Sequence, residues 1–481
     1  MCALLAMAVL AMAAQAQAAG APLPKVRIAA DGRHFETADG RPFVPFGVNY
    51  YRPNTGWPPK IWNTFDAEAT ARHMALLNQY GGNCVRVFVT WGSMYREVGQ
   101  LTEAGIAKFD RFLEICEANG IYVHPTGPEH WEGGTAASRA DTFSEEGMVA
   151  LEQFWKLFAG RYKGRNVIFA YDLRNEPSAP RSGPAMQARW NRFVRERYGS
   201  GEGAARAWGL ASVDLDRVPM PGAAGRGGRG AQPAAGPDSR RMLLDFQHCR
   251  EELADEWTRR QVEAIKSADP DALVTVGAIQ WSIPSNLGNV MSYSAFRPER
   301  QARYLDFLSF HFYPLEQGSY EYDDPVMEQR NLAYLEGIAR EVAKVGKPVL
   351  IGEFGWYGGG TFRAGGRDSR FATEQQQADF VARLIQVTDG LVCGWLNWGM
   401  FDHPEARDVS RVTGLFTVDE KPKAWGERFR QLAAHYAGRR IEPRALPNRP
   451  DLPWDECIVN VEAANAFRDA YFSAFAAEGQ R

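Results

Sequence analysis

Residues 349–355 have the sequence VLIGEFG, a short apolar run that ends on Glu353 and is then broken by glycine. A run of this length between a proline and a glycine predicts a buried parallel strand rather than a helix. Residues 167–177 have the sequence VIFAYDLRNEP and repeat this arrangement, with Glu176 at the end and a proline after it. Parallel α/β proteins carry their chemistry at the carboxyl ends of the strands. We therefore expect Glu176 and Glu353 to meet at one rim of a sheet.

The composition describes a large globular protein with a neutral partner. The chain has 481 residues, of which 45% are hydrophobic and 12% aromatic, enough for one large barrel or two to three average domains. Its 55 basic and 58 acidic side chains give a net charge of −3, so no overall field attracts nucleic acid or an anionic membrane. The 14 Trp and 17 Tyr residues offer the flat apolar faces on which sugar rings stack. We expect a carbohydrate partner and no nucleic acid.

Residues 1–19 are apolar and then small, and they contain two overlapping small-x-small motifs at residues 14–16 and 16–18. This pattern predicts a secretory signal peptide, while a membrane anchor would need a longer and less alanine-rich run. We expect a secreted or periplasmic protein with no membrane contact after the signal peptide is removed. Of the six cysteines, Cys2 would be lost with the signal peptide, and the scattered others form no CxxC motif. Neither a disulfide framework nor a zinc site is therefore expected.

From residue 46 to residue 438 the chain alternates short apolar runs with longer amphipathic segments. The predicted strands are residues 46–50, 83–89, 121–123, 167–173, 273–276, 307–310, 349–351 and 391–396. Helices are predicted from Asp66 onward and over residues 105–119, 145–161, 184–198, 240–267 and 423–436. Eight strands in alternation with helices are typical of an α/β protein with a (β/α)8 TIM barrel, which we expect to be the catalytic domain.

Three further segments complete the predicted domain organisation. Residues 20–45 contain two Asp-Gly turns between short β-like runs, which predict an N-terminal β-hairpin below the barrel. Residues 218–238 are rich in Gly, Ala and Arg and predict a flexible insertion in the fourth βα connection. Residues 439–481 predict a C-terminal helical extension, with one helix over residues 461–476, that packs outside the barrel.

The residues that end the predicted strands are mostly polar or aromatic. Besides the two glutamates they include Asn49, Arg86, Trp91, His124, His130, Asn175, Trp281, His311, Tyr313 and Trp398. Hydrolysis of a glycosidic bond needs a proton for the leaving oxygen and a nucleophile or a water molecule at the anomeric carbon. Two nearby carboxylates divide these tasks, because their repulsion and unequal surroundings separate their pKa values. The pattern therefore favours a glycoside hydrolase.

Four of these residues fit particular tasks around the two glutamates. Arg86 would hold Glu353 ionised as the nucleophile, and Tyr313 would hydrogen-bond Glu353. Asn175 would donate to the sugar hydroxyl beside the reacting carbon, and Trp398 offers a flat face to a pyranose ring. The remaining candidates for substrate binding are His311, His130, Asn49, Trp91 and Trp281.

Five short motifs follow one another in the order of the predicted strands. They are Val85-Arg86, Asn175-Glu176-Pro177, His311-Phe312-Tyr313, Gly352-Glu353-Phe354-Gly355 and Trp395-Leu396-Asn397-Trp398. With this set the sequence resembles the clan A glycoside hydrolases, especially family five (cellulases and mannanases), from about Phe46 to Tyr436. The resemblance implies a retaining mechanism with Glu176 as acid/base and Glu353 as nucleophile, and an endo-acting β-glycanase. We expect no cofactor, no metal and a monomer.

Two segments depart from the family-five pattern. Many relatives end the third strand on an Asp-Trp-His-like run, whereas residues 124–130 here have the sequence HPTGPEH. Either His124 or His130 could then face the sugar, and we favour His130. Residues 189–209 resemble a segment of the family forty-two β-galactosidases of the same clan, so a β-galactosidase-like exo-glycosidase is the alternative to a β-linked glucan or mannan hydrolase.

Two hypotheses from other classes remain open. A metal-dependent barrel hydrolase would use His124, Glu176, His311 and Glu353 as ligands, although the chain has no His-x-His or His-Glu-x-x-His motif to support it. A glycan-binding barrel without catalysis would not need both glutamates. The leading expectation is a secreted retaining β-glycoside hydrolase that cleaves O-glycosidic bonds in a β-linked glucan or mannan.

Overall fold

The structure is a computed structural model that describes residues 22–57, 60–133, 135, 141–221 and 237–479. The predicted signal peptide at residues 1–19 and most of the predicted insertion at residues 218–238 lie outside the described residues.

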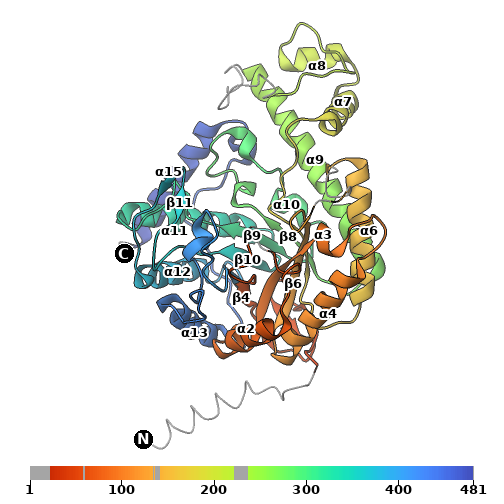
Figure 1. Ribbon diagram of the computed structural model, residues 1–481. Coiled ribbons are helices and arrows are strands. Elements are labelled where there is room, and N and C mark those ends of the chain that lie inside the picture. The colour runs from red at the N-terminus through yellow and green to blue at the C-terminus, as the bar shows by residue number, and fades with distance from the viewer. Residues whose placement is uncertain (1–21, 58–59, 134, 136–140, 222–236, 480–481) are drawn as a thin grey trace, which may run out of the picture.

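Eight parallel strands close into a barrel in the order β10-β13-β4-β5-β6-β7-β8-β9, which confirms the predicted TIM barrel (Figure 1). The strands are β4 (Phe46–Asn49), β5 (Cys84–Thr90), β6 (Tyr122–Glu129), β7 (Tyr171–Asn175), β8 (Val274–Ala278), β9 (Leu308–Phe312), β10 (Val349–Phe354) and β13 (Trp395–Trp398). Three boundaries differ from the prediction by four residues or more, and one of them is the start of β13, at Trp395 rather than residue 391. The other two belong to β6 and β7. β6 continues to Glu129, and β7 begins at Tyr171, since residue 168 joins β6 only through an isolated bridge.

Helices cover the outside of the barrel (Figure 1). They are α2 (Ala67–Gln79), α3 (Trp91–Met94), α4 (Glu103–Ala118), α6 (Glu145–Tyr162), α9 (Pro237–Ala268), α10 (Pro298–Gln301), α11 (Pro325–Ala343), α12 (Glu374–Thr388) and α13 (Ala424–Tyr436). Their starts follow local chemistry: α12 begins with a capping box in which Thr373 and Gln376 bond each other's backbone N–H. Short 3-10 turns η1 (Gln280–Ser282), η2 (Val290–Ser292) and η3 (Val409–Val412) and the ribbon β11 (Arg363–Ala364) with β12 (Arg367–Asp368) lie in the connections.

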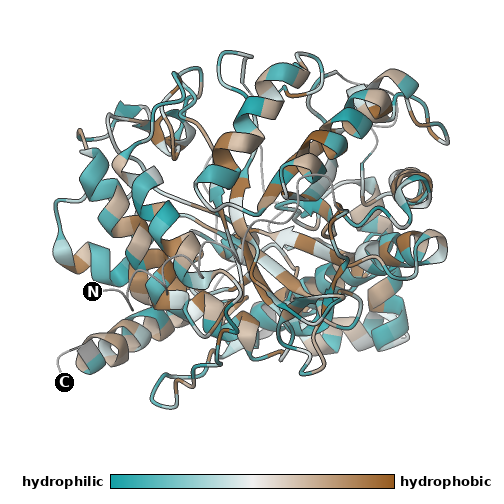
Figure 2. Ribbon diagram, turned by 90° about the horizontal axis from the view of Figure 1, so that it is seen from below, coloured by the Kyte–Doolittle hydropathy of each residue, from teal (hydrophilic) through white to brown (hydrophobic). Residues whose placement is uncertain are grey.

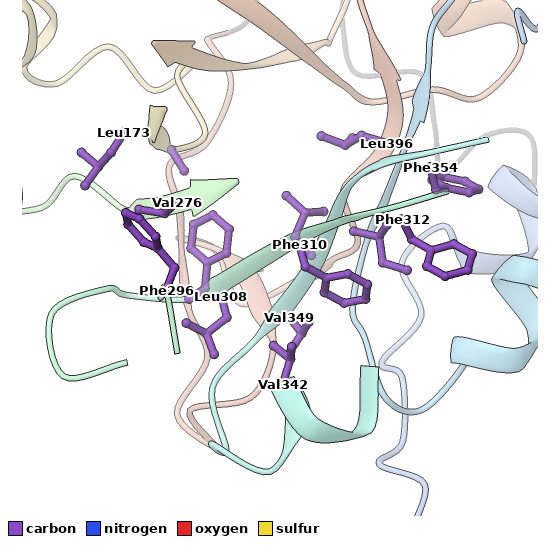
Figure 3. Close-up of a cluster of buried hydrophobic side chains, with 14 of the residues drawn as sticks. Leu173, Val276, Phe296, Leu308, Phe310, Phe312, Val342, Val349, Phe354 and Leu396 are labelled. Carbon is purple, nitrogen blue, oxygen red and sulfur yellow. The ribbon is translucent and has the colours of Figure 1, made fainter. Parts of the chain in front are cut away.

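The main core lies between the barrel strands and the helices. Figure 3 shows one part of it, where Phe310 of β9 and Val349 of β10 pack against Val342 of α11. Burying a side chain of this size contributes about 1.5–3 kcal/mol. Figure 2 shows the corresponding pattern over the whole molecule, with hydrophobic residues on the strands and hydrophilic residues on the outer helix faces. Within the described segments, no helix combines the length and hydropathy that crossing a membrane requires.

The N-terminal segment forms three antiparallel strands rather than the predicted hairpin. They are β1 (Val26–Ile28), β2 (Phe35–Thr37) and β3 (Pro42–Phe43). The first Asp-Gly turn joins β1 to β2 and the second joins β2 to β3, so two turns give three strands. Phe35 of β2 packs edge-on against Phe169 and Phe307, whose ring centroids lie 5.0 and 5.1 Å away. Both partners precede barrel strands, so this small sheet covers the amino-terminal end of the barrel.

The C-terminal residues pack against the outside of α11. They form α14 (Trp454–Cys457), which was not predicted, and α15 (Val461–Gly479). Glu336 of α11 accepts a bond of 2.7 Å from Arg449 Nε and one of 3.1 Å from the Tyr471 hydroxyl. This buried polar contact anchors the extension.

A helical arm leaves the barrel after β7. It consists of α7 (Pro184–Tyr198) and α8 (Gly201–Trp208) packed on the first part of α9, and in Figure 1 it stands away from the barrel. Trp190 stacks on Trp208 at 5.6 Å, which gives the arm an apolar centre. Val218 closes this centre and is only 1% exposed, and its N–H donates to the Asn191 side chain. The predicted flexible insertion therefore starts too early at residue 218, since residues 218–221 belong to the packed arm.

Candidate active site

Strand alternation brings polar side chains into the barrel. On β9, Phe310 and Phe312 point to the outer layer (Figure 3), so His311 between them points inward. On β7, Leu173 points outward in the same figure and Asp172 points inward. The β7–β8 ladder is irregular between Asp172 and Asn175, which re-aims the end of the strand towards the rim.

Glu353 is held by Arg86 of β5, across the barrel, and by Tyr313, which follows the neighbouring strand β9. Its side chain is 4% exposed, and Oε1 accepts a bond of 2.6 Å from Arg86 Nη1. The Tyr313 hydroxyl donates to Oε2 at 2.9 Å. Both contacts stabilise the ionised carboxylate.

Arg86 is completely buried and organises the floor of the site. Its Nε and Nη2 donate to Asp172 Oδ2 at 3.0 and 2.8 Å, in addition to the bond to Glu353. Nη1 also donates to Asn49 Oδ1 and Nη2 to Asn175 Oδ1, both at 2.9 Å. Because Arg86 occupies the amide oxygen of Asn175, the Asn175 NH₂ group is left to donate to a substrate.

Glu176 follows β7 and lies across the rim from Glu353. Its N–H donates to Gly277 O at 2.8 Å, and its φ of 47° lies in the left-handed region, which is rare for a residue with a Cβ. His311 Nδ1 lies 3.1 Å from Glu176 Oε1 and 3.6 Å from Glu353 Oε1. One oxygen of each glutamate and a His311 nitrogen lie within 4.8 Å of one another. The two carboxyl groups therefore share one small site.

The surroundings separate the acid strengths of the site residues. Burial raises the pKa of Glu176 to about 7, opposed by the charge of Arg86. Burial also raises the pKa of Glu353, opposed by His311, Arg86 and the Tyr313 hydroxyl. Of the two glutamates, only Glu353 forms a direct ion pair with Arg86. Glu353 is therefore more readily ionised, and Glu176 is the better proton donor. Burial lowers the pKa of His311 to about 4, so the imidazole ring is neutral at pH 7 and carries a single N–H group.

Two glycines leave the space that these side chains fill. A Cβ on Gly277 would stand 2.8 Å from both Asp172 Oδ2 and His311 Nε2, and one on Gly352 would stand 2.7 Å from Ser309 Oγ. Such distances are shorter than van der Waals contact. Gly277 and Gly352 are therefore part of the site; Gly352 was noted only as part of a motif, and Gly277 was not noted from the sequence.

The structure thus places seven of the predicted site residues in one network. They are Glu176, Glu353, Arg86, Asn175, His311, Tyr313 and Asn49. Asn49 is completely buried, and its amide donates to Gly352 O at 2.9 Å, so it supports Arg86 and the β10 backbone rather than facing a substrate. Trp398 lies beside this network in an aromatic cluster with Tyr51 and Phe88.

The substrate-binding prediction for Trp91 is wrong. Its side chain is 1% exposed and packs 5.6 Å from Tyr95 and 6.3 Å from Phe154 of α6. The chain enters α3 directly after Thr90, which turns Trp91 into the helix layer. Trp281 in η1 is partly buried against the main core, and its contact with a substrate stays a prediction.

The two candidate histidines differ in depth. His124 is buried inside the barrel, where Nδ1 lies 2.7 Å from Ala170 O and the ring packs 5.6 Å from Phe169. Burial lowers the pKa of His124 to about 4, and a sugar at the rim cannot reach it. His130 lies on the rim, with its side chain 65% exposed beside Trp131.

Several residues near the site were not predicted as site residues. Asp172 supports Arg86, and Glu129 at the end of β6 accepts the Asn175 N–H at 3.0 Å. Tyr51 stands beside Trp398, and His403 stands beside Tyr51. Tyr51 could have been found from strand period: Tyr50, which bonds His73 of α2 at 2.9 Å, faces outward, and its neighbour must face the other way. No local signal marked His403.

Two family models match overlapping parts of the chain. The model described as cellulase (glycosyl hydrolase family 5) matches residues 37–207, and the model described as beta-galactosidase matches residues 142–355. Among curated proteins, a mannan endo-1,4-beta-mannosidase A from Emericella nidulans is 28% identical over 181 residues. That match spans 47% of the mannosidase and 32% of this chain.

Similar solved structures share the fold at low sequence identity. GH5_18 from Streptomyces cattleya, in complex with GlcNAc, has a TM-score of 0.61 at 17% identity, over 92% of each chain. An exo-beta-1,4-mannosidase from Opitutaceae bacterium strain TAV5 has a TM-score of 0.58 at 18% identity, over 85% of this chain and 62% of that one. A beta-galactosidase from Halorubrum lacusprofundi has a TM-score of 0.59 at 16% identity, over 81% of this chain and 58% of that one.

Proposed function

The chain is a clan A glycoside hydrolase of the family-five-like type, and on that premise we propose that it is a secreted, retaining β-glycosidase of β-linked mannan or glucan. The observation that carries the proposal is the pair of strand-end glutamates with unlike surroundings. Glu353 is paired with Arg86 and Tyr313, and Glu176 has a pKa of about 7.

The separation of the glutamates supports double displacement. Inverting glycosidases hold their carboxyl groups about 6.5–9.5 Å apart to admit a water molecule, and retaining ones about 5–5.5 Å apart. Here one oxygen of each glutamate lies within 4.8 Å of the other. The space between them suits an anomeric carbon in contact with Glu353 better than a carbon separated from it by water.

In the first step, a Glu353 oxygen would attack the anomeric carbon while Glu176 gives its proton to the leaving oxygen. In the second step, Glu176 would take a proton from water, which attacks the same carbon and releases Glu353. The free NH₂ group of Asn175 is oriented by Arg86 to donate to the neighbouring sugar hydroxyl. The Tyr313 hydroxyl would stabilise Glu353 as it leaves.

The metal-dependent alternative is disfavoured by the charge already present. Glu176, His311 and Glu353 lie close enough together to hold an ion. However, Arg86 Nη1 lies 2.6 Å from Glu353 and would repel a cation there, and His124 is buried away from the rim. Unchanged activity after exhaustive chelation is expected, and a loss that a divalent metal restores would support the alternative.

The substrate is proposed from similarity. The curated relative and the exo-acting structural neighbour are named for mannoside cleavage, which favours a β-mannoside. A β-galactoside is the second candidate, because the beta-galactosidase model covers residues 142–355, including both glutamates. A panel of aryl β-mannosides, β-glucosides and β-galactosides would decide between them.

The stereochemical outcome tests the mechanism. Proton NMR of the anomeric signal in the first minutes should show the β-product before mutarotation. The Glu353→Ala variant serves as the blank for contaminating activity. An initial α-product would refute the retaining assignment.

Export is proposed from residues 1–19 alone. The measurement is the N-terminal sequence of the protein recovered from the periplasm or the medium of an expressing bacterium. We expect it to begin near residue 20, and recovery of the intact N-terminus from the cytoplasm would contradict export.

A further inference from the structure

An aromatic cluster separate from the main core stands at one end of the site. Tyr51, Phe88 and Trp398 are buried in it, with Trp57, Trp131 and Tyr313 packed around them. The Tyr51 ring lies 5.1 Å from Trp398 and 6.0 Å from Trp57. His403 is completely buried beside these rings, 5.4 Å from Tyr51 and 5.2 Å from Trp57.

The cluster joins two βα connections that are far apart in sequence. Tyr51 and Trp57 follow β4, whereas His403 follows β13, and the two strands are neighbours in the barrel. The Gly56 N–H donates to Glu405 Oε2 at 2.7 Å, which ties the two connections together. We call Tyr51, Trp57, His403 and the Gly56–Glu405 bond the end wall. Because the rings contact one another and the Gly56 N–H is bonded to the Glu405 side chain, a glycan chain cannot pass between these residues.

The chemistry of the site shows which part of a substrate meets the end wall. Glu176 must face the leaving oxygen, so the leaving group lies towards β7. The sugar under attack lies over Glu353 on β10 and extends away from Glu176, towards β13 and β4. Those strands carry Trp398 and lead to Tyr51. The end wall therefore stands on the non-reducing side of the reacting sugar.

Two polar groups of the end wall are left for a ligand. The buried Tyr51 hydroxyl and the buried His403 ring nitrogens have no hydrogen bond of ordinary geometry among the described residues. Ser410 lies beside the Tyr51 hydroxyl, the Gly56 N–H lies beside the His403 ring, and Glu405 Oε2 lies 3.5 Å from His403 Nε2. Burial raises the pKa of the Tyr51 hydroxyl, and the charges of Asp408 and Glu353 raise it further, so this hydroxyl stays protonated and can donate. A buried polar group without a partner costs stability, and a ligand hydroxyl would satisfy it.

We propose that the end wall recognises the free hydroxyl groups of a single non-reducing terminal sugar, so that the protein acts in exo mode. This inference rests on the proposed glycosidase function and names its mode of attack. It replaces the endo mode that was expected from the sequence. A chain that continues beyond the reacting sugar would carry a glycosidic oxygen and a further ring where Tyr51, Trp57 and His403 stand.

The first test uses the unmodified protein and two kinds of substrate. With β-1,4-mannopentaose labelled at its reducing end, the first products should be mannose and labelled tetraose. A p-nitrophenyl β-mannobioside should release nitrophenol only after a lag, whereas the p-nitrophenyl β-mannoside should release it at once. Immediate release from the bioside, or early labelled biose and triose, would overturn the exo mode while leaving the glycosidase function intact. Absence of cleavage on every aryl glycoside would instead overturn the proposed function.

Variants test the residues of the end wall. Trp57→Ala should remove the lag with the bioside and raise the ratio of bioside to monoside cleavage by about tenfold or more. Tyr51→Phe removes only a hydroxyl and should raise KM for the monoside by about 2–10-fold, the range that one neutral hydrogen bond contributes. Its kcat should change less than its KM, because the group lies away from the reacting carbon.

Matched controls lie outside the end wall. Tyr50→Phe changes the neighbouring tyrosine, whose hydroxyl bonds His73 on the α2 side, and should leave KM unchanged. Trp454→Ala removes an indole from α14 in the C-terminal extension and should leave the lag unchanged. If Trp57→Ala keeps the wild-type lag and Tyr51→Phe keeps the wild-type KM, the end wall does not recognise the substrate and the proposal fails.

Discussion

Replacing Gly277 by alanine adds one methyl group to the floor of the site. The added Cβ would stand 2.8 Å from Asp172 Oδ2, 2.8 Å from His311 Nε2 and 3.1 Å from Arg86 Nη2. These partners are buried, and Asp172 and Arg86 are bonded to each other, so none can swing into solvent. The Cβ must instead push them apart by several tenths of an ångström.

That displacement is expected to harm activity more than stability. Overpacking a buried site costs about 1–3 kcal/mol. The displaced Arg86 and His311 hold Glu353 and Glu176, and a misplacement of about 1 Å in a catalytic constellation can cost about 10²-fold in rate. We therefore expect kcat/KM on an aryl β-glycoside to fall by about 10–10²-fold in protein that remains folded.

The assay pairs initial rates with thermal unfolding followed by circular dichroism. Gly288→Ala is the matched control, because a Cβ on this exposed glycine would meet nothing within 4 Å. It should keep wild-type activity and stability. If Gly277→Ala keeps kcat/KM within a factor of two of wild type, the packing around Asp172, His311 and Arg86 does not control the site, and the reasoning is wrong.

The remaining predictions concern the two glutamates and the connection beyond the arm. Glu176→Ala should retain much more activity on a dinitrophenyl glycoside than on polysaccharide, because general acid catalysis, about 10²–10⁴-fold, matters only for a poor leaving group. Azide should rescue that variant as the β-glycosyl azide and rescue Glu353→Ala as the α-azide; reversed products would interchange the roles. Because burial raises the pKa of Glu176 to about 7, kcat/KM should fall as pH rises through 7. The same shift means that the folded state binds this proton more tightly than the unfolded state. Protonation of Glu176 therefore stabilises the fold fully below about pH 4.5, and this stabilisation is lost as pH rises through 7. Glu176→Gln should therefore raise the melting temperature at pH 8 more than at pH 4, and an equal effect at both pH values would contradict burial as the cause. Deleting residues 222–236 should leave turnover and melting temperature nearly unchanged, and a large loss of activity would show that this segment acts on the substrate.

The barrel could be predicted because each strand has a recognisable local sequence pattern. Short apolar runs bounded by Gly or Pro recur from Phe46 to Leu396, and a run buried on both faces has few alternatives to a parallel strand. The ends of the strands were harder to predict than the presence of the strands. β6 continues through the sequence HPTGPE, where two prolines argue against a strand, because its pairing with β5 outweighs local propensity.

The polar residues of the rim could also be recognised from the sequence, but how deeply each side chain is buried could not. Glu176 and Glu353 stand at strand ends and Arg86 lies within β5, so the three charged groups could be recognised as a set beside apolar runs. Trp91 also follows a strand, yet it packs into the helix layer at 1% exposure. Sequence position along a strand does not say on which side the chain leaves it.

The sequence by itself determined the fold class, the pair of glutamates and the kind of chemistry, because period, strand ends and charge are local properties of the chain. Only the tertiary structure decided what those glutamates touch. The Arg86 network joins β4, β5, β7 and β10, and the packing of Gly277 of β8 against Asp172 of β7 and His311 of β9 depends on three strands. The end wall joins connections that begin about 350 residues apart. Such contacts depend on barrel closure, whose register and twist are set by the packing of all eight strands together.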